Sequence, residues 1–353
     1  MIKKIINIII LLFSISILVS CGGTIEKNQY TVTFNSNGGS AVSEQVVYEG
    51  DRIYKPRNPE RQGYVFDAWY YDDQKWYFSS QTINQDITLV AKWYLQPKDG
   101  VIYMLNDEYD SYYVSDYLGD ASSVTITSTH RGLPVTKIGS WSFYDSKVSE
   151  FILPDSITYI GDCAFADCDN IYSIKLPNNL DEIVGGAFQN CDRLNEFIVP
   201  KSVTKLSIAL LSRCPSLRKI EVESGNRFYD SRGNCNAIIE TATNRLISGC
   251  RNTVIPNSVE IIAYGAFSKC TSLHSIKIPS SVIEIEQYAF EASGLQYIYI
   301  PKTVVKIGYG AFADCWNLTI YCETDARPTT WSEEWNKSHY HVVWSYVEEN
   351  KEE

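Results

Sequence analysis

Ten cysteines and four histidines are the side chains of this 353-residue chain most able to bind a metal or to act as nucleophiles. Zinc sites built on cysteine need convergent ligands at short loop spacing, such as a C-x2-C pair with partners, and the sequence contains no such pair. Neighbouring thiols could instead form disulfides in an exported chain. We favour a buried column of small apolar side chains, because five cysteines recur at one position of a repeated pattern and Ser293 replaces the cysteine in another copy. The five are Cys168, Cys191, Cys214, Cys270 and Cys315.

The histidines give no catalytic pattern. They lie beside no Gly-x-Ser-x-Gly, phosphate-binding loop or metal motif; they are His130, His274, His339 and His341. Carboxylates are numerous, so a glycosidase-like pair stays open on sequence alone. A shallow repeat surface, however, offers no deep pocket to desolvate such a pair. We therefore predict no enzyme, no catalytic or metal site, and no cofactor.

Cys21 is the one cysteine for which the sequence predicts a modification. An apolar run of about 15 residues follows two lysines, which is typical of a signal peptide and short for a membrane-spanning helix. It ends in Leu18-Val19-Ser20-Cys21-Gly22, which resembles a bacterial lipobox. That resemblance implies a signal peptide over residues 1–20, a lipid on Cys21 as the membrane anchor, and a tether over residues 21–29. The alternative is an ordinary signal peptide with a chance cysteine; either predicts export.

The net charge of -11 limits the partners. Nucleic-acid binding needs clustered Lys and Arg, and no cluster occurs, so we predict no nucleic-acid partner. The same charge repels an anionic membrane surface. Attachment to a membrane would then be covalent or mediated by another protein.

Residues 154–199 contain two consecutive copies of one unit. Each begins with proline, continues with spaced aliphatic residues, and reaches an Ala-Phe step before its cysteine, as in Ala164-Phe165 and Ala187-Phe188. Seven such units begin at prolines between positions 134 and 301. A repeat of this length indicates a solenoid, since one unit cannot bury its apolar face until neighbours stack on it.

These units resemble the BspA-like leucine-rich repeats of bacterial surface proteins. The resemblance implies parallel strands in stacked coils over residues 134–323, after a linker and N-terminal cap at 95–133. A C-terminal cap and acidic tail would occupy residues 324–353. The array is interrupted at 223–255 by a hairpin pattern, which we expect to project from the rim; a role in ligand contact stays open.

Residues 30–94 have a different texture. Tyr30 to Phe34 alternates like a strand, and Asn37-Gly38-Gly39-Ser40 is typical of a tight turn. The segment resembles the internalin-type B-repeat, or Listeria-Bacteroides repeat, a small β-grasp-like module. The predicted fold class is therefore mainly β: this module followed by a leucine-rich repeat solenoid.

Within each repeat the end segment alternates, so every second side chain should face solvent. Stacked strands would place these side chains in an exposed ladder, the usual binding surface of leucine-rich repeat proteins. Ile198, Tyr297 and Tyr299 are the expected anchors, since interface hot spots favour aromatics amid exchangeable polar neighbours. The alternative is a solvated sheet face. The candidate ligand-binding residues are Lys175, Glu196, Ile198, Lys219, Glu221, Lys277, Tyr297 and Tyr299.

Two functions fit this organisation. The first is a lipid-anchored surface protein that binds a host or microbial protein or glycan through the ladder. The second is a structural cell-envelope spacer without a specific ligand. A binder should carry a coherent aromatic or charged patch on the ladder, and a spacer an evenly polar one. Ligand, organism, oligomeric state and the side of the envelope that the lipid faces do not follow from the sequence.

Overall fold

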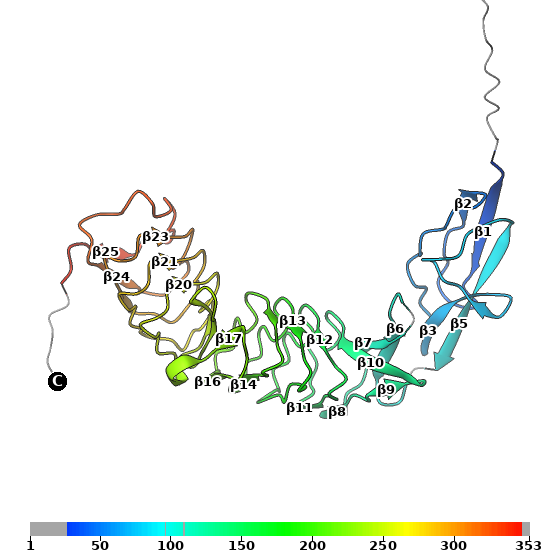
Figure 1. Ribbon diagram of the computed structural model, residues 1–353, viewed down its shortest axis with the longest axis horizontal. Coiled ribbons are helices and arrows are strands. Elements are labelled where there is room, and N and C mark those ends of the chain that lie inside the picture. Colours follow the sequence, from blue (N-terminus) through cyan, green and yellow to red (C-terminus); the bar gives the residue numbers. More distant parts are fainter. Residues whose placement is uncertain (1–26, 96, 109, 348–353) are drawn as a thin grey trace, which may run out of the picture. The chain divides into compact units, whose positions relative to one another are not determined.

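The computed structural model describes residues 27–95, 97–108 and 110–347 (Figure 1). The predicted signal peptide, Cys21 and the end of the acidic tail lie outside these residues. The chain divides into two compact units, Met1–Trp93 and Tyr94–Glu353. Strands dominate both units, and the described residues contain one short 3-10 helix and no α-helix. The prediction of a mainly β chain is confirmed.

The first unit is a five-stranded sheet with the order β2-β1-β5-β3-β4. β1 pairs with β5 in parallel and with β2 antiparallel, and β3 forms a hairpin with β4. Phe34, Phe66 and Trp69 fill its core edge to face. The strands are β1 Gln29–Asn35, β2 Gln45–Tyr48, β3 Tyr64–Tyr71, β4 Gln74–Lys75 and β5 Ile87–Leu95.

The second unit begins with a β-hairpin. Its two strands are antiparallel, and the second then pairs in parallel with β10, the first repeat strand of the stack. His130, at the end of β9, stacks on Tyr103 of this hairpin with ring centroids 4.5 Å apart. The hairpin thus covers the first coil, as a cap must. The strands are β6 Val101–Leu105, β7 Tyr112–Tyr117, β9 Thr129–His130 and β10 Leu133–Ile138.

Two parallel ladders run along the solenoid, whereas the sequence predicted one. The first ladder contains β11 Glu150–Ile152, β14 Glu196–Val199, β16 Lys219–Val222 and β22 Tyr297–Ile300, where the sequence predicted it, and extends through β8 Ser123–Thr125, β24 Thr319–Cys322 and β25 His341–Val343. Residues 173–176, which were also expected to form a strand of this ladder, are not in a regular strand. We call the solvent side of the first ladder the ladder face. The second ladder consists of β12 Tyr159–Ile160, β13 Glu182–Ile183 and β15 Lys205–Leu206, and later of β20 Ile261–Ile262, β21 Glu284–Ile285 and β23 Lys306–Ile307.

The Ala-Phe step forms the inside of a corner that every coil shares. The corner residue two positions after the phenylalanine has a left-handed backbone in each copy, as in Asp145, Asn190 and Asp314. Asn and Asp tolerate this conformation better than most residues. Inside the corner the rings stack: Phe165 lies 5.3 Å from Phe143 and 5.2 Å from Phe188, nearly parallel to both.

The cysteine column is buried, as predicted, and it makes a specific contact. The Cys168, Cys191 and Cys315 thiols each donate to the main-chain oxygen of the phenylalanine one coil earlier, at 3.0 to 3.2 Å. Burial raises the pKa of the Cys270 thiol to about 12 and holds those of the Cys168 and Cys315 thiols above their ordinary values too. The described cysteines are free. Desolvated, protonated thiols are poor nucleophiles, so this column is structural.

The prediction that residues 223–255 project from the rim is wrong. The predicted hairpin exists, as β18 Ala237–Glu240 and β19 Arg245–Gly249, but its apolar side chains lie in the solenoid core. β19 pairs in parallel with β20, the next strand of the second ladder. The segment, which we call the island, is therefore an irregular coil of the stack; it also contains β17 Tyr229–Asp230 and the 3-10 helix η1 Arg232–Asn234.

Island side chains replace main-chain pairing where the regular coils stop. The Tyr229 hydroxyl accepts a hydrogen bond from the Leu206 amide at the edge of β15, at 2.9 Å. The side-chain amide of Asn226 donates to the main-chain carbonyls of Pro200 and Val203. Buried main-chain groups need such partners, and the island supplies them from side chains.

A tryptophan-rich segment packs against the last regular coil. Trp331 and Trp335 are buried, with ring centroids 4.9 Å apart, and Trp335 meets Phe312 of the last regular coil edge to face. Residues 333–338 form turns. After these turns β25 extends the ladder beyond β24.

Candidate binding face

The alternation predicted for the ladder face holds. Lys175, Lys219, Glu221, Lys277 and Tyr297 are exposed, whereas the residues between them are buried. Glu196, Ile198 and Tyr299 are half-buried. Ile198 is less open than the sequence indicated, because Glu221 lies directly beside it in the β14–β16 pairing.

The charged residues in the middle of the face pair with one another. Lys219 Nζ lies 3.0 Å from a Glu221 oxygen on its own strand and 4.0 Å from a Glu196 oxygen on the neighbouring one. The hydrogen bond to Glu221 raises the pKa of Lys219 above its ordinary value. Since Lys219 is already held by two carboxylates, it offers an anionic ligand no free cation.

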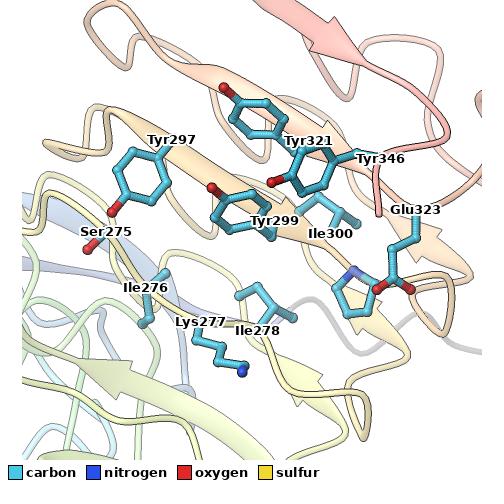
Figure 2. Close-up of a pocket in the computed structure, with 11 residues that line it drawn as sticks. Ser275, Ile276, Lys277, Ile278, Tyr297, Tyr299, Ile300, Tyr321, Glu323 and Tyr346 are labelled. Carbon is cyan, nitrogen blue, oxygen red and sulfur yellow. The ribbon is translucent and has the colours of Figure 1, made fainter. Parts of the chain in front are cut away.

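A cluster of four tyrosines occupies the end of the ladder face nearest the C-terminus. Figure 2 shows Tyr297, Tyr299, Tyr321 and Tyr346 gathered around one hollow. Tyr299 is central: its ring centroid lies 5.7 Å from that of Tyr297, 5.0 Å from Tyr321 and 5.3 Å from Tyr346. Burial, together with a hydrogen bond to Tyr346, raises the pKa of Tyr299. The four phenols thus form one continuous, neutral aromatic surface.

The hollow beside this cluster has a volume of ≈ 190 Å³. Lys277 and Glu323 stand at its rim (Figure 2), and Lys277 is paired with Tyr299 through the strand register. No ion pair holds Lys277 in the described part of the chain. Apolar rings with a few convergent polar groups are the usual composition of a ligand site.

Sequence reasoning found only half of this cluster. Tyr321 is on β24 in the register position of Tyr299, so extending the ladder by one coil would have predicted it. Tyr346 follows β25, in the cap that departs from the repeat, and its amide is fixed by a bond to the Cys322 carbonyl. No periodicity indicates Tyr346; only the fold places its ring 4.7 Å from Tyr321.

Lys175 belongs to a second hollow on the same face, ≈ 720 Å³ in volume. Ile152 and Tyr172, which line it, are 51% and 56% exposed. At its edge the Asp155 carboxylate accepts hydrogen bonds from the Asn178 main-chain and side-chain nitrogens, which hold the pKa of Asp155 below its ordinary value. The structure thus separates Lys175 from Lys277 and the two tyrosines that the sequence grouped with it.

The described residues lack two further features, a cluster of metal ligands and a membrane-spanning helix. No three His, Cys, Asp or Glu side chains there converge as metal ligands would. The same part of the chain contains no long apolar helix of the kind that crosses a bilayer.

Comparison with known proteins identifies both units. Residues 121–240 and 245–324 match the BspA type leucine-rich repeat region, in six copies. Residues 30–92 match the Listeria-Bacteroides repeat domain. Solved structures similar to the chain include a leucine-rich repeat protein from Eubacterium ventriosum (23% identity, 67% of this chain and 72% of that one, TM-score 0.49). Another, from Bacteroides ovatus, is 21% identical over 71% of each chain, with a TM-score of 0.47.

Two curated relatives from Evansella cellulosilytica match short stretches. One, named "Putative Gly-rich membrane protein", is 46% identical over 71 residues, which are 19% of this chain and 8% of the relative. The other, named "Putative membrane protein", is 36% identical over 115 residues, 32% of this chain and 15% of the relative. The chain thus matches only a small part of either protein.

Stacked coils with parallel ladders and a repeated Ala-Phe corner define the second unit as a leucine-rich repeat solenoid. The chain belongs to the BspA type leucine-rich repeat family. Proteins of this family are associated with the cell surface and are generally not enzymes.

Proposed function

We propose that this protein is a lipid-anchored surface module that binds a host or microbial protein or glycan through the ladder face, with the tyrosine cluster as its anchor. The observation that carries the proposal is the contact of Tyr299 with three other tyrosine rings beside an open hollow. Clustered aromatic side chains dominate binding energies at interfaces. Tyrosine adds a hydroxyl that can bond to a polar ligand.

The solenoid pre-organises this anchor. Ile298 and Ile300 alternate with the tyrosines and are buried in the core, so the strand cannot rotate its outward rings away. β24 fixes Tyr321 beside Tyr299 through regular main-chain pairing. Because the rings are already held in place, binding would cost little side-chain entropy.

The test is a double substitution, Tyr297→Ala with Tyr299→Ala, assayed against immobilised extracellular-matrix proteins and whole bacterial cells. Losing a hot spot costs ~2 kcal/mol or more, about thirtyfold in affinity. Neither ring belongs to the buried core, so the melting temperature should change little. A matched control is Tyr264→Ala with Tyr288→Ala, since these rings also contact each other, at 5.9 Å, but lie outside the ladder face. Equal losses in both variants would remove the cluster as the anchor.

The lipid anchor is a separate part of the proposal and rests on the lipobox around Cys21. Cys21→Ser should leave an uncut precursor that incorporates no palmitate label. Labelling that persists in this variant would place the lipid elsewhere or remove it from the proposal. Binding by the ladder face would be unaffected by that outcome.

A structural spacer is the second candidate. The observation that favours it is the mutual pairing of Glu196, Lys219 and Glu221, since charges that pair with one another on the same face are suited to solvation. Under this function the Tyr297 and Tyr299 variant would retain all cell-surface properties. The two candidates therefore differ in the same experiment.

A further inference from the structure

A third hollow, ≈ 500 Å³ in volume, follows the shared corner of the solenoid. It has no lining residue in common with the two hollows of the ladder face. Its walls come from two columns of the repeat: the left-handed position after the Ala-Phe step, and the position after the cysteine. We call it the corner groove; it extends from Asp192 to Trp316.

Two irregularities of the repeat shape this groove. First, no island residue lines this groove. The Ser272 hydroxyl donates to the Pro215 carbonyl at 2.8 Å, although the two residues are 57 positions apart. The regular coils before and after the island therefore meet here directly.

Second, one coil is a residue shorter at the groove. Ser293-Gly294-Leu295 stands where the neighbouring coils have Cys-x-x-Leu. The Gly294 amide bonds to the Cys270 carbonyl at 3.1 Å, and a Cβ atom on Gly294 would lie 2.0 Å from the Thr271 main-chain oxygen. Only glycine allows this close approach. The main chain of this coil therefore lies close to the preceding coil, and small residues form the floor of the groove.

Trp316 stands beside this floor with 86% of its surface exposed. No other ring or cation packs on its indole in the described part of the chain. Trp141 is also exposed, at 52%, but its ring contacts Tyr144 at 5.1 Å. An indole exposed beside a hollow contributes nothing to the core, but it offers a ligand a favourable surface.

Arg213 and Lys269 supply the charge of the groove. They occupy the left-handed corner position in the coils on either side of the island. Within the described residues neither is in an ion pair, although the chain as a whole carries a net charge of -11. Asp192 lies towards one end of the groove and leaves the middle basic. A carboxylate-bearing ligand complements this pair of cations, and guanidinium binds carboxylate with two parallel hydrogen bonds.

We propose that the corner groove binds an acidic saccharide, with a sugar ring on Trp316 and carboxylates at Arg213 and Lys269. An acidic peptide fits less well, because the groove has few main-chain donors left to pair with it. The amides of Lys269, Ala292 and Gly294 already bond to the carbonyls of Glu291, Ala313 and Cys270. Recognition must therefore use side chains, which suits a saccharide with a flat face and regularly spaced carboxylates. This site does not depend on the ladder face.

The test is to titrate the full chain, in mild detergent, with a short oligogalacturonide. Binding is measured by tryptophan fluorescence and by calorimetry. We expect saturable binding that weakens as salt rises. Trp316→Ala and the double variant Arg213→Gln with Lys269→Gln should each weaken it about tenfold or more. The methyl-esterified oligosaccharide should bind at least as weakly, since it lacks the charges.

Matched variants separate a ligand site from a general effect. Trp141→Ala removes an exposed tryptophan outside the groove and should leave binding unchanged; Tyr297→Ala with Tyr299→Ala should do the same, which distinguishes this site from the ladder face. No saturable binding of the acid form would overturn the proposal, as would equal binding of the methyl ester. Tighter binding of a poly-glutamate peptide would assign the groove to acidic proteins.

Discussion

The coils before the island and the coils after it repeat the same backbone plan but carry different side chains on the ladder face. In the two coils just before the island the outward positions carry paired charges, with Lys219 close to two glutamates. After it the same positions carry Tyr297, Tyr299 and Tyr321 in ring contact. The inward positions do not differ in this way, because both halves bury Ile, Leu, Phe and Val.

The difference teaches where this fold permits variation. An inward side chain contacts the coil on each side, so a change there must fit two neighbours at once. An outward side chain has only its ladder neighbours and solvent. Function can therefore be placed on one half without altering the coils that support it.

The phenylalanine stack also divides at the island. Phe143, Phe165 and Phe188 form one stack, and Phe267, Phe290 and Phe312 another. Between them Leu211 holds the next position, and Gly249 lies so close to Phe267 that a Cβ would meet its ring at 2.2 Å. The two halves thus have separate aromatic cores joined by an aliphatic one.

The largest expected effect is on stability. Phe188→Ala and Phe290→Ala should each cost ~3–5 kcal/mol, because both rings are fully buried between coils. In a one-dimensional stack such a loss acts mainly on the nearest coils. Hydrogen exchange should therefore quicken before the island in the first variant and after it in the second. If either variant loosens both halves equally, the stack is a single cooperative unit and the division at the island is wrong.

A smaller effect tests whether the part of the ladder face before the island takes part in binding. Lys219→Ala with Ile198→Ala, before the island, should leave binding to any partner of the tyrosine cluster nearly unchanged. The charged pairs are solvent-exposed, and exposed ion pairs contribute little. Surface plasmon resonance on the double variant checks this. A loss comparable to that of the Tyr297 and Tyr299 variant would extend the site over both halves.

The smallest effect concerns acid. His130 is partly buried against Tyr103, and this burial lowers its pKa below the ordinary value of 6.5. The unfolded chain therefore takes up the proton first, so stability contributed by neutral His130 is present above pH 6.5 and is lost as the pH falls below it. The N-terminal cap should loosen in mild acid before the rest of the solenoid. His130→Phe should abolish the loosening of the cap in mild acid. If that variant still loosens as the wild type does, other groups cause the effect.

Much of the architecture followed from the sequence because the repeat constrains it. The cysteine column, the buried phenylalanines and the alternation of Ser173 to Leu176 all follow from one period, since equivalent positions meet equivalent neighbours. The second ladder was missed, because two-residue strands such as β12 leave no alternation to detect. The island was misplaced for a related reason: its hairpin pattern is local, whereas its burial depends on the coil edges on which it packs.

The sequence by itself determined the repeat, its register, and the outward direction of Tyr297 and Tyr299, because the period of a strand fixes which side chains face solvent. Only the tertiary structure decided which of those side chains form a site. Tyr346 joins the tyrosine cluster from beyond the repeat, and Lys175 separates from it into another hollow. Pro215 meets Ser272 across 57 residues. Such contacts depend on how irregular segments close against regular coils, and no local pattern of residues contains that information.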